Sequence, residues 1–486
     1  MDSPQLKLVS VLEREIDLLM DVRIRWQGPT RPPVPSATEC KHSCWPSHSP
    51  LVRKKSGHLP DGRMPNALSQ RREFDQLCGQ LCEGMSHRAA VARFVARVVP
   101  SDTEGVAYFM ARAVKEMALM SAEPVAALPV WQPAWSSQPL FNLSEALDSP
   151  CGFDWHSGAS SGLPHCNITS PGRGAGRECT AVRASTEAWH NDARYVYPAT
   201  ARREGKYCLG KCRRSDWAHA MAPELLPACM LGALFQPAPS LTPRFNRLMR
   251  TLADESVLAI GIYLRSDHAE VAHRSDSQST SAFAGPKAGW QPAARYSVAA
   301  ATLCALQLER RWGEGFERVV WLVVADDPAV NEEFTRQYDQ TSGAGVSAAT
   351  TTGVGPSGRR RVLRTGSSGR HSKPDAASQH SSLDAYGDSL RDALADWFLL
   401  SEVDIGVLAP ALRNIPYTFG RTAFARGART RSVYAPPSMD AALASFAAAN
   451  DSDGAPPVLV RCGADDAFAP MWGGHVVTRS GGKVEL

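Results

Sequence analysis

Apolar, strand-like runs alternate with helix-like runs through the second half of the chain, from Val257 to Tyr434. Unbroken apolar runs such as 257–264 and 319–325 are typical of strands that are buried on both faces of a parallel sheet. The stretches between them carry apolar residues at helical spacing, and short linkers join the two kinds of element. This alternation predicts an α/β fold in which right-handed crossovers connect the parallel strands of a doubly wound, Rossmann-like sheet.

The bounds of the elements follow from turn residues, caps and the spacing of apolar positions. Strands are expected at 257–264, 318–325, 361–364, 404–409 and 431–434. Helices are expected at 297–312 with Ser297 as N-cap, from Pro328 onward with Asp327 as N-cap, and at 383–403, 418–428 and 438–449. Residues 341–382 are rich in Ser, Thr, Gly and Arg, so we interpret them as a disordered insertion.

The first half of the chain shows no comparable alternation. It predicts a short amphipathic helix at 6–22, helical segments at 86–121 and around 229–239, and no second parallel sheet, so this half is expected to be irregular and mostly helix and loop. We therefore divide the chain into a disordered linker with one helix (1–85), an irregular cysteine-containing region (86–250), a Rossmann-like domain (251–450) and a C-terminal tail (451–486).

Composition and charge exclude several classes of protein. The 486 residues are enough for two or three domains. The formal net charge of +4 is small for this length, so it gives no reason to expect a nucleic-acid partner. No apolar run approaches the roughly 18 residues that would span a bilayer. The N-terminus also lacks the basic and then apolar layout of a signal peptide.

Cysteines and glycosylation sequons lead to a different expectation about compartment. Ten of the twelve cysteines lie before residue 230, and three pairs have C-x3-C spacing. That spacing suits zinc, but no His/Cys set completes a site, so disulfides in an oxidising compartment fit the pattern better. Sequons at Asn142, Asn167 and Asn450 also favour a secretory location. The N-terminus and these features disagree, and the sequence leaves the compartment open.

Polar residues follow the expected strands at the edge of the sheet where ligands bind in doubly wound folds. Arg265 follows the first strand and Asp326 follows the second, while Tyr417 and Thr418 open the expected helix at 418–428. A guanidinium holds phosphate oxygens in pairs, and free amides at the start of a helix suit a diphosphate. The arrangement predicts an anionic ligand of the nucleotide type.

Each of these residues also has a purely structural interpretation. Arg265 is well placed to pair with Asp267 or Asp326 at the rim of the sheet. Asp327 is favoured as an N-cap, because it directly precedes a proline that suits the first turn of a helix. Asp396 is interpreted from the pattern alone as a solvated carboxylate on a helix.

The loop after the first strand supplies candidates for acid–base chemistry. His268, Glu270 and His273 follow Arg265 closely, and each can serve as general base for an acceptor hydroxyl. An isolated histidine or glutamate in a loop is more often a surface residue, so spacing alone selects none of them.

Four segments taken in order resemble the fucosyltransferase superfamily, which includes α-1,6-fucosyltransferases, protein O-fucosyltransferases and plant and algal relatives. They are Gly261-Ile-Tyr-Leu-Arg-Ser-Asp267, Val323-Val-Ala-Asp-Asp-Pro328, Asp396-Trp-Phe-Leu-Leu-Ser-Glu-Val-Asp404 and Thr418-Phe-Gly-Arg-Thr-Ala423. Each motif is loose, so the resemblance depends on their order and spacing. Together with a similar segment at 229–237, it covers about residues 225–435, which is less than half of the chain.

The resemblance implies a GT-B fold of two facing Rossmann-like domains, with GDP-fucose held by the C-terminal one and no metal ion. It also implies an inverting transfer of fucose to a glycan or protein hydroxyl, and hence a location in the Golgi or ER lumen. By the same resemblance Arg265 would hold the donor β-phosphate, and Glu270 lies nearest to the position of a catalytic carboxylate. The other implied donor contacts are Asp267, Asp326, Asp396, Thr418, Phe419, Gly420, Arg421 and Thr422.

The chain also departs from the family pattern. Tyr263 stands where the family usually has His, the segment Arg265-Ser-Asp267 is one residue short, and Thr418 or Gly420 replaces the usual Ser. No glycine-rich opening motif for an acceptor domain is found. Two alternatives therefore stay open. One is a module that binds a nucleotide sugar or glycan without catalysis, and the other is an unrelated Rossmann-like interaction protein that uses the basic segment 359–370.

Overall fold

The computed structural model describes the sheet-forming half of the chain most fully. The described residues are 3–21, 94–98, 106–107, 110, 127–131, 145–148, 165–167, 228, 231–232, 234–254, 256–265, 290–313, 316–339, 360–365, 383–410, 418–427, 433–450, 462–464, 476–477 and 483–484. Most of the expected insertion at 341–382 lies outside these ranges. Among the described helices, none combines the length and the apolar character that crossing a bilayer requires.

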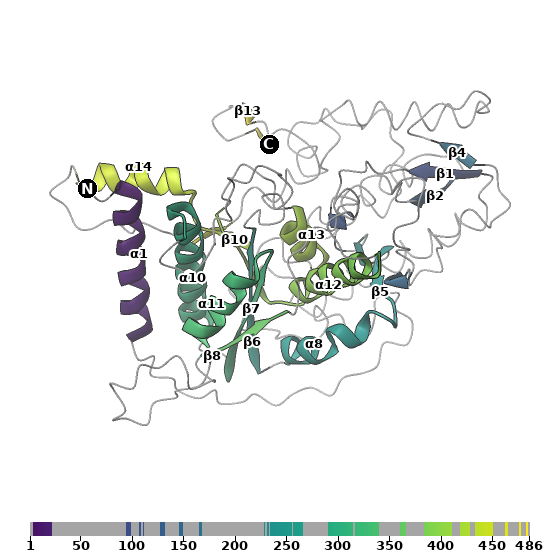
Figure 1. Cartoon of the computed structure of the whole chain (residues 1–486), viewed down its shortest axis with the longest axis horizontal. Coiled ribbons are helices and arrows are strands. Elements are labelled where there is room, and N and C mark those ends of the chain that lie inside the picture. The colour runs from purple at the N-terminus through teal and green to yellow at the C-terminus, as the bar shows by residue number, and fades with distance from the viewer. Residues whose placement is uncertain are drawn as a thin grey trace, which may run out of the picture.

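A six-stranded sheet forms the centre of the fold (Figure 1). Its strands are β6 (Val257–Leu264), β7 (Arg318–Ala325), β8 (Arg360–Arg364), β9 (Ile405–Leu408), β10 (Val433–Ala435) and β11 (Gly463–Ala464). They lie in the order β11-β10-β9-β6-β7-β8, and all pairs are parallel except β10 with β11. The order β8-β7-β6-β9-β10 is that of a doubly wound sheet, which confirms the predicted α/β class.

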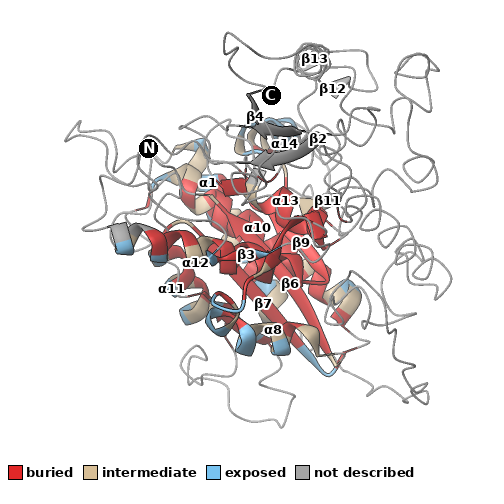
Figure 2. Ribbon diagram, turned by 90° about the vertical axis from the view of Figure 1, so that its right-hand side faces the viewer, coloured by how far each residue is buried: buried red, intermediate tan, exposed pale blue. Residues whose placement is uncertain are grey.

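Helices cover both faces of this sheet, and Figure 1 shows them as two groups. The helices α10 (Pro292–Trp312) and α11 (Pro328–Tyr338) lie on one side, while α8 (Asn246–Ala253), α12 (Leu383–Ser401) and α13 (Thr418–Arg426) lie on the other. All eight residues of β6 are consequently buried. A strand enclosed on both faces needs apolar residues along its length. The unbroken apolar runs in the sequence therefore predicted the positions of β6 and β7 correctly. Figure 2 shows the buried residues concentrated in these strands and in α10.

Alternate residues of β6 point to the two helical layers. Leu258, Ile260 and Ile262 belong to the core cluster shared with α10. Gly261 faces the opposite layer, where an added Cβ would lie 2.9 Å from Val403 Cγ2. Arg265 has the parity of Gly261, so the alternation along β6 directs it toward the layer that contains α12 and α13.

The start of α10 differs from the prediction. The helix begins at Pro292 with Gln291 as N-cap, so Ser297 is not a cap. The Ser297 hydroxyl instead donates a hydrogen bond of 2.7 Å to the carbonyl oxygen of Pro410, which follows β9. The predicted cap of α11 is confirmed, because the Asp327 carboxylate accepts a hydrogen bond of 2.9 Å from the backbone N–H of Ala329.

The predicted N-terminal amphipathic helix is present as α1 (Pro4–Asp21), and it packs on α10. Leu8, Leu12 and Ile16 belong to the same core cluster as the sheet residues. An ion pair of 2.8 Å between Arg295 and Glu13 fixes one end of this contact. The helix α14 (Met439–Asn450) also contacts α1 and α10. The first residues of the chain are therefore part of the sheet's core.

A second parallel sheet lies in the first half of the chain, which corrects the prediction. It contains β1 (Phe94–Val98), β2 (Ala127–Trp131) and β4 (His165–Asn167) in the order β2-β1-β4. The pattern at 86–121 predicted a helix through the residues of β1. Short apolar runs fit the spacing of a helix as well as that of a strand. Here the residues form a strand because they pair with β2 and β4, which lie further along the sequence. This half is therefore not merely helix and loop.

Smaller elements link the two halves. Near the predicted segment 229–239, the described residues Ala228, Leu231 and Leu234 are helical as expected. Two short antiparallel pairs are formed by β3 (Leu147–Asp148) with β5 (Gln236–Pro237), and by β12 (Val476–Val477) with β13 (Lys483–Val484). A 3-10 turn, η4 (Thr242–Arg244), precedes α8.

A disulfide joins Cys304 in α10 to Cys462, the residue before β11. Both cysteines come from the regular half of the chain, where the sequence suggested few such bonds. The bond attaches the C-terminal segment to the helix that covers one face of the sheet, and it closes a separation of 158 residues.

Candidate functional site

The candidate site lies where the winding of the sheet reverses, at the carboxyl ends of β6 and β9. The chain leaves β6 toward α10 on one face and leaves β9 toward α13 on the other. Connections that diverge in this way open a crevice beyond the strand ends, and ligands of open α/β sheets bind in such crevices. Arg265 is the first residue beyond β6 and is half-buried.

Arg265 and Asp326 directly follow two neighbouring strands. Leu264 pairs with Ala325 as the last pair of the β6–β7 ladder, so Arg265 and Asp326 are the first residues beyond the ends of two adjacent parallel strands. Both are half-buried. If the alternation of residues along β6 and β7 is continued by one position, both fall on the face of the sheet that α12 and α13 cover. The structure thus brings together two residues that lie 61 positions apart, as the sequence predicted (326 − 265 = 61).

The first turn of α13 packs directly against the end of β6. The ring of Phe419 stacks on the ring of Tyr263, with centroids 5.5 Å apart and an interplanar angle of 21°. Beside it, a Cβ on Gly420 would lie 2.6 Å from Tyr263 Cδ1, so only glycine allows this approach. Tyr263 is two residues before Arg265 on the same strand. The helix start and Arg265 therefore lie on one rim of the sheet.

Thr422 holds α13 against α12. Its hydroxyl accepts a hydrogen bond of 2.9 Å from the indole Nε1 of Trp397 and donates one of 3.0 Å to the carbonyl oxygen of Phe419. The residue is fully buried. The resemblance implied that Thr422 contacts the donor, whereas these hydrogen bonds of its hydroxyl are to Trp397 and Phe419. Of its predicted neighbours, Arg421 is also buried and Phe419 is half-buried.

Asp396 is only 4% exposed, so its interpretation as a solvated helix carboxylate is wrong. It lies in α12 directly before Trp397, on the part of the helix that packs into the domain. A carboxylate is costly to bury, and one that is retained at such a position is held by specific interactions. Family resemblance was the only sequence signal that raised Asp396 above an ordinary surface residue.

Asp404, which closes the same motif, has a structural role. Its carboxylate accepts a hydrogen bond of 2.8 Å from the backbone N–H of Ala259, and its own N–H donates one of 2.9 Å to the carbonyl of Ala259. This side chain therefore extends the pairing of β9 with β6 at their amino ends, on the opposite edge from the crevice.

A buried arginine at the end of α13 holds this helix against the end of α12, and sequence reasoning missed it. The guanidinium of Arg426 lies 4.7 Å from the ring centroid of Phe398 and 5.7 Å from that of Trp397. It donates a hydrogen bond of 2.7 Å to the Ser401 hydroxyl and forms an ion pair of 3.5 Å with Glu402. Burial lowers the pKa of Arg426 from its ordinary value, and the charge of Glu402 acts in the opposite direction.

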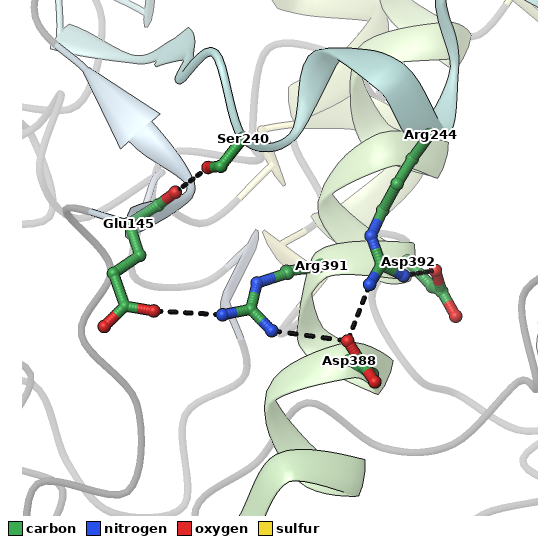
Figure 3. Close-up of polar contacts among 6 residues, drawn as sticks. All are labelled: Glu145, Ser240, Arg244, Asp388, Arg391 and Asp392. Carbon is green, nitrogen blue, oxygen red and sulfur yellow. Dashed lines mark hydrogen bonds and ion pairs between the residues drawn. The ribbon is translucent and has the colours of Figure 1, made fainter.

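A network of ion pairs joins α12 to the first half of the chain (Figure 3). Arg391 pairs with Glu145 at 2.9 Å and with Asp388 at 3.3 Å. Arg244, from η4, pairs with Asp388 at 2.6 Å and also with Asp392. Burial raises the pKa of the Asp392 carboxyl, and the bond to Arg244 lowers it. The Ser240 hydroxyl also donates to the Glu145 carbonyl. No sequence motif marked this network.

Several predicted site residues lie outside the described residues. They are Asp267, His268, Glu270, His273 and the side chain of Thr418, whose backbone is helical. No general base can therefore be placed relative to Arg265. Within the described part of the chain, no group of three or more His, Cys, Asp and Glu residues is arranged to hold a metal ion.

Comparison with known proteins gives distant structural matches. No protein-family model matches the chain, and no curated protein matches its sequence. The chain is similar to the NodZ α-1,6-fucosyltransferase co-crystallised with GDP, at 12% identity and a TM-score of 0.32, covering 71% of this chain and 94% of that one. NodZ from Bradyrhizobium gives a TM-score of 0.33 at the same identity and coverage.

A plant structure is also similar. A point mutant of Arabidopsis thaliana FUT1 in complex with GDP matches at 12% identity and a TM-score of 0.38, and the match covers 83% of this chain and 84% of that one. At such identities and scores the likeness is a distant one of fold.

Proposed function

We propose that this chain is a glycosyltransferase that transfers fucose from GDP-fucose to a hydroxyl group of a glycan or protein, with inversion at the anomeric carbon. One observation carries the proposal: Arg265, Asp326 and the first turn of α13 lie on one rim of the sheet, at the point where its winding reverses. The identity of the nucleotide and sugar follows the resemblance of the four motifs.

Arg265 and α13 have complementary roles in this proposal. The guanidinium holds the β-phosphate of the donor, and the backbone N–H groups at the start of α13 face the diphosphate. Both stabilise the negative charge that grows on GDP as it leaves, which is an electrostatic form of catalysis. Asp326 contacts the base or ribose, and Asp396 supports the donor from α12. No metal ion is required, because the guanidinium and the helix start supply the positive charge.

The proposed chemistry is a single displacement. The oxygen of the acceptor hydroxyl forms a bond to the anomeric carbon while the bond from that carbon to the β-phosphate oxygen breaks. GDP leaves with the electron pair of the broken bond, and the hydroxyl proton passes to a carboxylate. We assign that carboxylate to Glu270. We assign the parallel sheet of β1, β2 and β4 to the acceptor side.

A binding measurement tests the donor site first. We expect GDP to raise the melting temperature of the full chain and to bind in calorimetry, whereas Arg265→Ala abolishes both effects because the phosphate loses its charged partner. Arg361→Ala, an exposed arginine on β8, is the matched control and should bind GDP like the unaltered protein. Absence of GDP binding up to millimolar concentrations would contradict the proposal.

A turnover measurement then separates catalysis from binding alone. The enzyme should release GDP from GDP-fucose, faster when glycan or peptide acceptors are present, and Glu270→Gln should lower this rate without weakening GDP binding. The shortened segment Arg265-Ser-Asp267 favours one second candidate, a module that binds the nucleotide sugar without catalysis. GDP binding without any transfer to a broad acceptor panel would support that candidate instead.

A further inference from the structure

We infer that Trp397 is a positioning residue for the proposed donor site, and that it acts through Thr422 on the first turn of α13. The inference rests on the proposed function. Its basis is the pair of hydrogen bonds that runs from the Trp397 indole to the Thr422 hydroxyl and on to the Phe419 carbonyl. Trp397 lies in α12, whereas Thr422 and Phe419 lie in α13, so the relay fixes one helix relative to the other.

Phe419 is the residue on which two constraints meet. Its carbonyl oxygen accepts the Thr422 hydroxyl at 3.0 Å, and its ring stacks on Tyr263 with a centroid separation of 5.5 Å. Tyr263 belongs to the strand that ends at Arg265. The relay therefore sets the rotation of α13 about its own axis, and the aromatic stack sets its distance from the strand that carries Arg265.

The relay is well suited to hold this geometry because solvent does not reach it. Trp397 and Thr422 are both fully buried, so water does not compete for the indole N–H or the hydroxyl. A buried donor or acceptor that loses its partner pays its desolvation cost in full. Small rotations of α13 that would lengthen either bond are therefore disfavoured. The backbone N–H groups at the helix start consequently keep one orientation.

The orientation of the helix start matters for ligand binding, because a displacement of about 1 Å in a positioning group can cost a large factor in function. Removing the indole N–H while keeping an aromatic ring should therefore lower the affinity of the site for a diphosphate. The bulk of the packing between α12 and α13 would remain.

The experiment compares four single variants of the full chain, and the double variant Trp397→Phe with Thr422→Val, by calorimetric titration with GDP. Trp397→Phe removes the donor, and Thr422→Val removes the hydroxyl while keeping the shape of the side chain. Thr422→Ser restores the hydroxyl. Trp321→Phe is the matched control, because Trp321 is a fully buried tryptophan on β7 whose Nε1 has no hydrogen-bond partner among the described residues.

We expect Trp397→Phe and Thr422→Val each to weaken GDP binding by about three- to ten-fold, because a smaller fraction of the free protein then holds the start of α13 in the orientation that binds GDP. Because both remove the same relay, the double variant should be no weaker than either single one. Thr422→Ser and Trp321→Phe should bind GDP like the unaltered protein, even though Trp321→Phe lowers the melting temperature. A purely structural role for Trp397 would not give this separation of affinity from stability.

Two failures are distinguishable. If the unaltered protein does not bind GDP, the proposed function is wrong and the inference falls with it. If the unaltered protein binds GDP and Arg265→Ala does not, but Trp397→Phe and Thr422→Val bind as tightly as the unaltered protein, the positioning role alone is wrong. Loss of cooperative unfolding in both variants would likewise assign the relay to folding only.

Discussion

The ring of Tyr263 stacks on the ring of Phe419 at a centroid separation of 5.5 Å, and this contact joins the strand that ends at Arg265 to the first turn of α13. Two parts of the chain that are separated by more than 150 residues thereby meet at the crevice beyond β6 and β9 (419 − 263 = 156). The proposed donor site depends on this junction, because it places a guanidinium and a helix start on the same rim.

The first prediction concerns the glycine beside this stack. In Gly420→Ala the new Cβ would lie 2.6 Å from Tyr263 Cδ1, so α13 must move away from β6. We expect the free energy of unfolding to fall by about 1–3 kcal/mol, as for other overpacked sites, and GDP affinity to fall with it. Chemical denaturation and GDP titration measure the two effects.

A second substitution shows whether the clash is the cause. Tyr263→Leu in the Gly420→Ala background shortens the side chain that the new methyl group meets, so it should recover part of the lost stability. If the double variant is less stable than the sum of the two single changes predicts, the stated contact is not the reason for the loss.

The second prediction is a pH dependence at Tyr296. Burial raises the pKa of this phenol above its ordinary value of 10.0, and its hydroxyl donates a hydrogen bond of 2.9 Å to the Pro437 carbonyl. The unfolded chain therefore loses this proton first. The stabilising contribution is complete below about pH 10 and is lost as the pH rises beyond it, at about 1.4 kcal/mol per pH unit for one such group.

Tyr296→Phe should lower stability at neutral pH by about 1 kcal/mol, the net value of one hydrogen bond, and reduce the loss of stability above pH 10. Urea denaturation at pH 7, 9.5 and 10.5 measures both. The slope should not vanish, because burial also raises the pKa of Tyr338. An alkaline slope identical in the variant and the unaltered protein would show that Tyr296 does not contribute.

The third prediction concerns a buried ion pair at the edge of the sheet. Arg360 in β8 forms two hydrogen bonds of 2.7 and 2.8 Å with the Glu309 carboxylate and lies 4.4 Å from the ring centroid of Trp321. In Arg360→Met the carboxylate stays buried without this partner, so we expect a loss of about 3–5 kcal/mol in the free energy of unfolding.

Arg361 provides the matched control, because it is the next residue on β8 and is exposed. Arg361→Met should change stability by less than about 0.5 kcal/mol, in line with other surface sites. The double variant Arg360→Met with Glu309→Leu should be more stable than Arg360→Met alone. Equal effects of Arg360→Met and Arg361→Met on the free energy of unfolding would show that Arg360 contributes no more to stability than an exposed arginine.

The fourth prediction concerns the disulfide between Cys304 and Cys462. Peptide mapping without reductant should yield a cross-linked pair of peptides from α10 and from the segment before β11. Replacing both cysteines by alanine should lower the free energy of unfolding by about 2–4 kcal/mol, because the unfolded chain regains the freedom of a long loop. Protein produced in an oxidising compartment that shows two free thiols at these positions would contradict the structure.

Much of the sheet could be predicted from the sequence, because the strands β6 and β7 are buried on both faces and each position must then be apolar. The position of Arg265 and Asp326 at the carboxyl edge of the sheet could be predicted for a related reason. The first polar residue after such a strand reaches the carboxyl edge of the sheet, whatever the rest of the chain does. The cap at Asp327 is equally local, since a carboxylate before proline has few other structural uses.

Other features depend on partners that are distant in sequence. The residues of β1 fit a helix or a strand until β2 and β4 are seen beside them. Ser297 looks like a cap until Pro410 is seen within hydrogen-bond distance. The helical pattern gives Asp396 no reason to be buried, and it leaves the Thr422 hydroxyl free for a ligand until α12 brings Trp397 to it.

Secondary-structure propensity and the apolar pattern of a strand buried on both faces depend on residues that are close together in the sequence. The sequence alone therefore predicts where these elements lie and which residues follow the strands at the rim of the sheet. Hydrogen bonds between helices, the close approach at Gly420 and the burial of a charge depend on how the elements pack. Because that packing brings together residues from different helices, the roles of Trp397, Thr422 and Arg426 become visible in three dimensions alone.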